Sequence, residues 1–187
     1  AGGTQRAPRL MGVEKALDFM VAGDPVSSEK AKESGLVDEV VSGDLRAAAI
    51  SYANRLLKAD QGVRRASQLT AALGQPADAF FAAARERIGK AWRGYPSPLA
   101  IAACVEAATK MAFAKGVAFE RQQFEKLVKT DESRALRHLF FAERQVGKIP
   151  DVPAETPTRE IKSAALIGAG TMGGGIAMNF ANAGIPV

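Results

Sequence analysis

The sequence AALIGAGTMGGGIAM, residues 164–178, is the strongest indication of architecture in this chain. Its first four residues end an apolar run, 161–167, which begins with a charged edge and predicts a buried parallel strand. The next six residues match the pattern G-x-G-x-x-G: Gly168, Ala169, Gly170, Thr171, Met172 and Gly173. A helix-like run, 174–183, follows them. This order predicts the first β-α unit of a Rossmann dinucleotide-binding domain.

Each glycine of the motif has a role in holding a pyrophosphate. Gly168 permits a tight turn, Gly170 lets the backbone approach the phosphates, and Gly173 lets the helix pack closely on the strand. The helix N-terminus adds free N–H groups and a partial positive charge. Residues 168–173 are therefore the predicted cofactor-binding residues, with NAD as the cofactor. The alternative is a glycine-rich turn that binds nothing.

The printed sequence ends soon after this motif. An acidic residue that would hold the ribose hydroxyls belongs about 20 residues beyond the glycines, together with further strands. Neither follows in the 187 residues, so we expect weak or undetectable NAD binding by this chain alone.

Upstream of the motif, apolar residues recur at a spacing near 3.6, which predicts amphipathic helices. The expected helices span residues 13–22, 29–34, 45–58, 77–93, 98–114, 117–128 and 131–145. The expected N-caps are Ser27 or Ser28, Asp44, Ser97 and Thr130, and Gly116 is the expected end of the helix that begins at Pro98. A short β-like run is expected at 36–41. The predicted fold class is therefore mainly α, followed by one β-α unit.

Composition limits the classes of protein to consider. The 187 residues are 47% hydrophobic and 24% charged, which is typical of a globular protein, and the longest apolar stretches are too short to span a bilayer. Cys104 is the only cysteine, so neither an intrachain disulfide nor a thiolate metal site is expected. The net charge of +5 is spread through mixed-sign helices, without an aromatic-rich basic run, which argues against nucleic-acid binding.

A change in composition marks a boundary. Residues 147–157 contain three prolines without a helical period, which predicts a semi-extended linker. The first residues lack an initiator Met and do not form a signal peptide, so the chain is expected to be an excised segment.

Four stretches resemble one family, the multifunctional enzymes of fatty-acid β-oxidation that join enoyl-CoA hydratase to L-3-hydroxyacyl-CoA dehydrogenase. Residues 1–12, AGGTQRAPRLMG, resemble the crotonase segment A-G-G-T-Q-R-L-P-R-L-x-G, and 31–41 resemble the A-x-x-x-G-L-V-D-x-V-V that follows it. Residues 133–144 are similar to the helix before the domain junction, and 168–178 to the opening of the dehydrogenase domain. The order of these stretches along the chain is the most specific part of the resemblance.

The resemblance implies a domain organisation and a chemistry. Residues 1–146 would be the C-terminal part of a crotonase-like hydratase domain with its junction helix, 147–160 a linker, and 161–187 the start of the NAD-binding domain. The family hydrates trans-2-enoyl-CoA and then oxidises the 3-hydroxyacyl-CoA product with NAD. Its catalytic glutamates lie upstream of these residues and its His and Glu pair downstream, so no catalytic residue is assigned here.

Other candidates for chemistry have simpler explanations. His138, the only histidine, is interpreted as an ordinary helix residue rather than a base. The carboxylates of Glu14, Glu39, Glu106 and Glu120 have no second carboxylate in a common cleft and are interpreted as solvated or ion-paired. Cys104 is expected in the core, and Phe140 with Phe141 in packing. Residues 2–4 are expected to begin a helix that supports the hydratase floor without doing chemistry.

Two alternatives stay open. One is a non-enzymatic helical module for partner or oligomer contact, with the stripes at 45–57 and 99–111 as the surfaces; the other is a small dinucleotide-binding regulator. For the enzyme hypothesis, the expected partners are acyl-CoA substrates and a thiolase subunit or further copies of the chain. The alanine-rich, single-cysteine composition favours a bacterial cytoplasm, with the peroxisome as the alternative.

Overall fold

The computed structural model describes residues 2–60, 62–153 and 155–187, so Ala1, Gln61 and Ala154 lie outside the described residues. The chain divides into two compact units, 1–138 and 139–187. The α-helices are α1 (Gly3–Met11), α2 (Val13–Ala22), α3 (Ser28–Glu33), α4 (Leu45–Ala59), α5 (Asp78–Ala91), α6 (Pro96–Lys110), α7 (Phe113–Leu127), α8 (Asp131–Val146) and α9 (Thr171–Asn182). Two single 3₁₀ turns, Ala66–Gln68 and Ala71–Leu73, precede α5. The predicted mainly α class is confirmed.

Local sequence signals explain most of these helices. Ser27 accepts the Lys30 backbone N–H at the start of α3, and Asp44 accepts the Arg46 and Ala47 N–H groups at the start of α4. Thr130 Oγ1 accepts the Ser133 N–H at 3.2 Å, in the first turn of α8. The oxygens of these side chains accept hydrogen bonds from first-turn N–H groups, which have no acceptor within the helix. The expectations for these three caps are confirmed.

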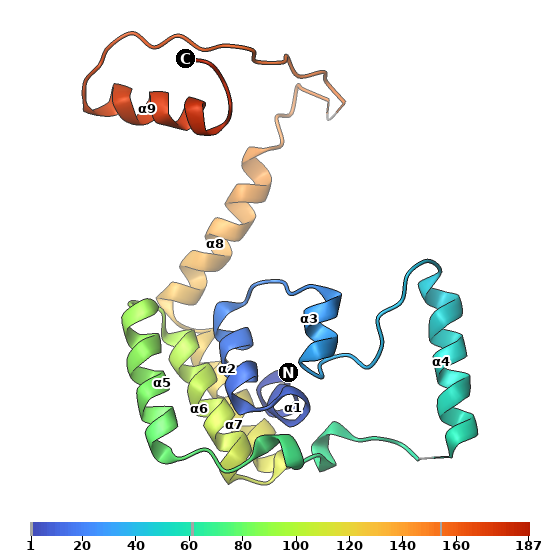
Figure 1. Cartoon of the computed structure of the whole chain (residues 1–187). Coiled ribbons are helices and arrows are strands. Elements are labelled where there is room, and N and C mark those ends of the chain that lie inside the picture. Colours follow the sequence, from blue (N-terminus) through green and yellow to red (C-terminus); the bar gives the residue numbers. More distant parts are fainter. Residues whose placement is uncertain (1, 61, 154) are drawn as a thin grey trace. The chain divides into compact units, whose positions relative to one another are not determined.

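The core of unit 1–138 lies between α2, α5 and α6, and α1 and α7 pack beside it (Figure 1). Its fully or nearly buried apolar side chains are Val13, Leu17, Leu73, Phe81, Ala84, Ile88, Ala102, Val105 and Ala108. Phe80 meets Phe81 edge-on, with 5.1 Å between ring centroids. Burial of these side chains, at roughly 1.5–3 kcal/mol for each large one, stabilises the unit.

Helix α1 carries two buried polar side chains, Gln5 and Arg9, which belong to the segment 1–12 that resembles the crotonase sequence. Gln5 is fully buried and donates through Nε2 to the Cys104 carbonyl at 2.7 Å. Arg9 is 4% exposed, donates to the carbonyls of Gln5 and Ala108, and stacks on Phe113 with its guanidinium carbon 5.1 Å from the ring centroid. Because Ala108 lies in the last turn of α6, the guanidinium meets the negative end of that helix. These contacts fasten α1 to α6 and α7.

The boundary between α6 and α7 differs from the prediction. Helix α6 begins at Pro96, so Ser97 lies inside its first turn and is not the N-cap. It ends at Lys110, and the backbone turns extended at Met111, where no glycine or proline marks the break. Gly116 was expected to end the helix and instead lies buried within α7. The absence of a side chain at Gly116 makes room for Gln5. Close packing, and not the end of a helix, therefore explains the glycine at this position.

Neither predicted strand is formed. Among the described residues no strand is assigned, and both 36–41 and 161–167 lie outside regular structure. Near the second run, the Ala164 N–H donates to the Pro186 carbonyl at 2.8 Å, and Ile167 is fully exposed. A parallel strand exists only when a neighbouring strand pairs with it, and these residues find no such neighbour in unit 139–187.

Helix α4 is amphipathic as expected but buries none of its residues. Its Leu45, Ile50, Leu56 and Leu57 are at least half exposed. By contrast, the stripe predicted at 99–111 supplies core residues of α6, so it is not a free surface. No helix among the described residues combines the length and the apolar character needed to cross a bilayer.

Candidate functional site

The glycine motif forms a turn and the start of α9 in unit 139–187. Gly168 has φ +108°, in the region that only glycine adopts readily, and Gly170 is the N-cap of α9. The helix begins at Thr171, so Thr171, Met172 and Gly173 form its first turn. Backbone N–H groups in a first turn have no acceptor within the helix and carry the positive end of its dipole.

Two glycines of the motif differ in what surrounds them. A Cβ built on Gly173 would lie 2.1 Å from the Gly168 carbonyl oxygen and 3.3 Å from Leu166 Cδ2, so only glycine allows α9 to pack this closely on the preceding segment. A Cβ on Gly170 would meet nothing within 4 Å, which leaves open space beside the helix N-terminus. A tight turn, an open approach and a close helix contact are the features that a dinucleotide pyrophosphate requires, so these residues fit NAD.

A second candidate site lies in unit 1–138 and was not identified from the sequence. It is an apolar cavity of about 650 Å³ between α1, α2, α6 and α7, in the size range of small-molecule sites. Its apolar wall comprises Met20, Ala100, Ile101, Val117, Phe124 and Leu127. Gly3 and Thr4 of the first turn of α1 line it as well. The predicted supporting role of residues 2–4 was the only signal that pointed to this region.

Glu120 of α7 is the acidic side chain that lines this cavity. Its carboxylate accepts the Gly2 backbone N–H at one oxygen and the Thr4 hydroxyl, at 2.5 Å, at the other. A negative charge at the N-terminus of α1 is also favourable for the helix dipole. The interpretation of Glu120 as a solvated or ion-paired residue was therefore wrong, because α7 places it against the start of α1.

Cys104 lies in the same wall, nearly fully buried. Burial raises the pKa of its thiol to about 11, and the charge of Glu120 acts in the same direction, whereas a hydrogen bond with Thr4 lowers it. Only 3% of Cys104 is exposed, which confirms the expectation that it is a core residue, and its raised pKa keeps the thiolate scarce at pH 7.

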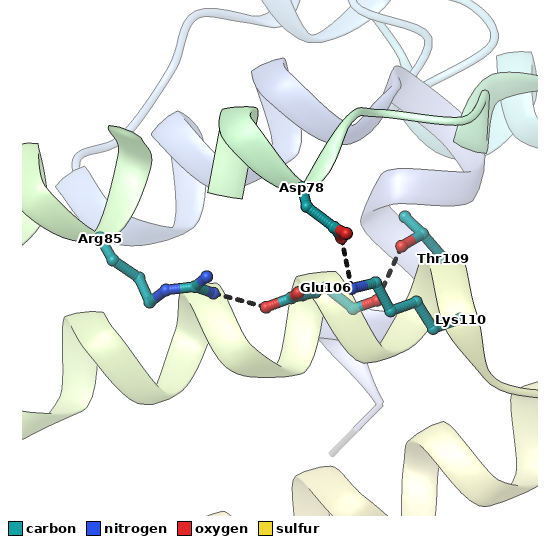
Figure 2. A network of polar contacts seen from close by, with 5 residues as sticks. All are labelled: Asp78, Arg85, Glu106, Thr109 and Lys110. Atoms are coloured by element: carbon teal, nitrogen blue, oxygen red, sulfur yellow. Dashed lines mark hydrogen bonds and ion pairs between the residues drawn. The ribbon is translucent and has the colours of Figure 1, made fainter. Parts of the chain in front are cut away.

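Two of the other candidate carboxylates, Glu39 and Glu106, lie in surface ion pairs. Figure 2 shows Glu106 of α6 between Arg85 and Lys110, with distances of 2.5 and 2.8 Å, and Lys110 also contacts Asp78 at 2.7 Å. The hydrogen bond from Lys110, reinforced by Arg85, lowers the pKa of Glu106. Glu39 pairs with Arg55. These contacts confirm the ion-paired interpretation for Glu39 and Glu106.

The other candidates do not assemble into a site. Glu14 and His138 are exposed on α2 and α8, and Phe140 packs edge-on against Phe141 with 5.3 Å between centroids. Among the described residues, no three histidine, cysteine, aspartate or glutamate side chains gather as metal ligands.

Comparison with known proteins places these features in context. No protein-family model matches the chain. A protein named peroxisomal bifunctional enzyme from Danio rerio is 37% identical in an alignment of 191 positions, which covers 100% of this chain and 26% of that protein. The fatty acid oxidation complex subunit alpha of Shewanella sp. (strain MR-4) is 36% identical over 180 positions, covering 94% of this chain and 25% of the relative. That of Shewanella amazonensis is 37% identical over 191 positions.

The chain thus spans about a quarter of the length of the curated relatives that it matches. The similarity runs through both compact units, from the α1 segment to the glycine motif, and each relative is named for fatty acid oxidation or as a bifunctional enzyme. The chain is homologous along its whole length to one segment of the bifunctional and alpha-subunit proteins of fatty acid oxidation.

Proposed function

We propose that this chain is part of a fatty-acid β-oxidation enzyme that hydrates trans-2-enoyl-CoA and oxidises L-3-hydroxyacyl-CoA with NAD. In this proposal, 1–146 is the C-terminal part of a crotonase-like hydratase domain, 147–160 a linker and 161–187 the start of a Rossmann domain. The observation that carries the proposal is the glycine turn, in which Gly173 packs where no Cβ fits and Gly170 leaves the helix N-terminus open. The names of the relatives support the choice of substrate class.

The residues that would hold NAD are those of the motif. Backbone N–H groups in the first turn of α9 would contact the pyrophosphate, and Gly168 and Gly170 would keep the turn open to it. When bound, NAD supplies the acceptor for hydride from the 3-hydroxyacyl-CoA. The acyl-CoA thioesters, a thiolase subunit and further copies of the chain are the proposed partners, and a bacterial cytoplasm or a peroxisome is the proposed compartment.

The test uses the native polypeptide that carries this sequence, recovered from its source cells with an antibody against residues 136–144. We expect it to hydrate crotonyl-CoA and to form NADH from 3-hydroxybutyryl-CoA. Substitution Gly173→Ala should abolish NADH formation and leave hydration unchanged, because the added Cβ would collide with the Gly168 carbonyl. Gly174→Ala is the matched control, since a Cβ there would meet nothing within 4 Å. Absence of both activities from the unsubstituted polypeptide would refute the proposal.

The alternative, a non-enzymatic interaction module, is favoured by one observation, the exposed apolar residues of α4. If α4 covers a partner or a second copy, the purified chain should increase in size with concentration, and Leu56→Lys with Leu57→Lys should abolish that increase. Enzymatic activity of the native polypeptide would decide between this alternative and the enzyme.

A further inference from the structure

We infer that Glu120 determines which acyl-chain lengths the hydratase accepts. Its carboxylate holds the first turn of α1 in place, and that turn forms part of the wall of the apolar cavity. This inference rests on the proposed function for its substrate class. The cavity of about 650 Å³, the carboxylate of Glu120 and the first turn of α1 all lie within unit 1–138.

The first turn of α1 has little intrinsic rigidity. It begins with Gly2 and Gly3, which have more backbone freedom than any other residue type, and Gly2 has φ +91°. No side chain of its own caps this helix. The N–H groups of a first turn also have no acceptor within the helix, although the Gly2 carbonyl accepts the Gln5 and Arg6 N–H groups. The position of this turn therefore depends on contacts from outside α1.

Glu120 supplies those contacts from α7. Its two carboxylate oxygens accept the Gly2 N–H and the Thr4 hydroxyl, so one side chain holds both ends of the turn. Hydrogen bonds to an ionised group are about twice as strong as neutral ones, and the charge also favours the helix N-terminus. The later part of α1 has its own anchors in Gln5 and Arg9, although Gln5 Nε2 also donates to the Thr4 hydroxyl at 3.2 Å.

The fixed turn is a wall of the cavity. Gly3 and Thr4 line it, together with the apolar side chains of Ile101 and Phe124 from α6 and α7. An apolar cavity of this size takes an extended hydrocarbon chain, and the free energy of burial grows with each methylene in contact with the wall. Release of the turn would therefore weaken binding of a long acyl chain more than binding of a short one.

The experiment measures hydration of crotonyl-CoA and trans-2-decenoyl-CoA by the native polypeptide. We expect Glu120→Ala to raise KM for decenoyl-CoA about tenfold, as expected for loss of a charge-assisted contact, and KM for crotonyl-CoA less than about twofold. Glu120→Gln should restore most of the preference, because its Oε1 can accept the Gly2 N–H while its Nε2 donates to the Thr4 hydroxyl oxygen. The matched control is Glu125→Ala, which removes an exposed carboxylate of the same helix that pairs with Arg121 at 2.5 Å.

Two results would overturn the inference. The first is an equal loss of kcat/KM for both substrates, which would give Glu120 a general structural role; the second is no change for either. If Glu120→Ala does not fold, Thr4→Val, which replaces the hydroxyl with a methyl group of similar size, must show the same chain-length dependence. Failure of the proposed function is a separate outcome, because the unsubstituted polypeptide would then hydrate neither substrate.

Discussion

The side chain of Gln5 in α1 occupies the space that a side chain at Gly116 in α7 would fill. A Cβ built on Gly116 would lie 2.0 Å from Gln5 Oε1 and 2.8 Å from its Cδ. Gln5 cannot easily move away, because it is fully buried and its Nε2 is bonded to the Cys104 carbonyl at 2.7 Å. The close approach of α1 and α7 therefore depends on this pair.

Substitution Gly116→Ala should destabilise the chain by about 1–3 kcal/mol, the usual cost of overpacking a core. The measurement is urea unfolding followed by circular dichroism. Gly89→Ala in α5 is the matched control, because a Cβ there would meet nothing within 4 Å. Since alanine is the better helix former, that control should raise stability by roughly 0.5–1 kcal/mol. An equal effect of the two substitutions would contradict the packing role of Gly116.

Arg9 should contribute more to stability than a surface arginine. Substitution Arg9→Met removes the donors to the Gln5 and Ala108 carbonyls and the contact with Phe113, and we expect a loss of about 2–4 kcal/mol. Arg87→Met serves for comparison, because Arg87 makes an exposed ion pair with Asp18 at 2.6 Å and should cost at most about 1 kcal/mol. Thermal unfolding of both variants checks this; similar melting temperatures would count against a buried anchor.

The thiol of Cys104 should react slowly with iodoacetamide at pH 8. Burial raises its pKa to about 11, so the thiolate is scarce in the folded chain. Because the folded pKa exceeds the ordinary value of 9.0, ionisation favours unfolding, and stability should fall as the pH rises from 9 toward 11. Mass spectrometry of the alkylated chain gives the rate, with urea-unfolded chain as the reference. Rapid labelling of the native chain at pH 8 would show that this site is open.

The pKa of Glu106 should depend on Lys110. The hydrogen bond from Lys110 lowers the pKa of Glu106, so Lys110→Ala should raise the pKa of Glu106 toward the ordinary value of 4.5. Carbon NMR titration measures this change. A lowered folded pKa stabilises the chain above about pH 4.5, and this contribution is lost as the pH falls through the lowered value. Lys90→Ala removes a lysine that pairs with Glu86 instead, so it should leave the titration of Glu106 unchanged.

The sequence by itself determined the helices that carry their own signals. The apolar spacing of 13–22 and the caps Ser27, Asp44 and Thr130 act within one or two turns, so α2, α4 and α8 begin where they were predicted and α3 begins one residue earlier. The glycine pattern at 168–173 likewise predicted a turn followed by a helix; α9 confirms the helix but begins at Thr171, inside the motif, rather than at residue 174.

Only the tertiary structure decided the features that need a distant partner. The break at Met111 and the burial of Gly116 follow from the packing of α6 and α7 against α1, and the placement of Glu120 at the start of α1 joins residues more than a hundred positions apart. The run 161–167 has the composition of a strand but no neighbouring strand, so it stays outside regular structure. Local propensity determines a helix because its hydrogen bonds are internal, whereas a strand, a cavity wall and the half-buried contact of Glu120 with α1 exist only when another segment supplies the other half.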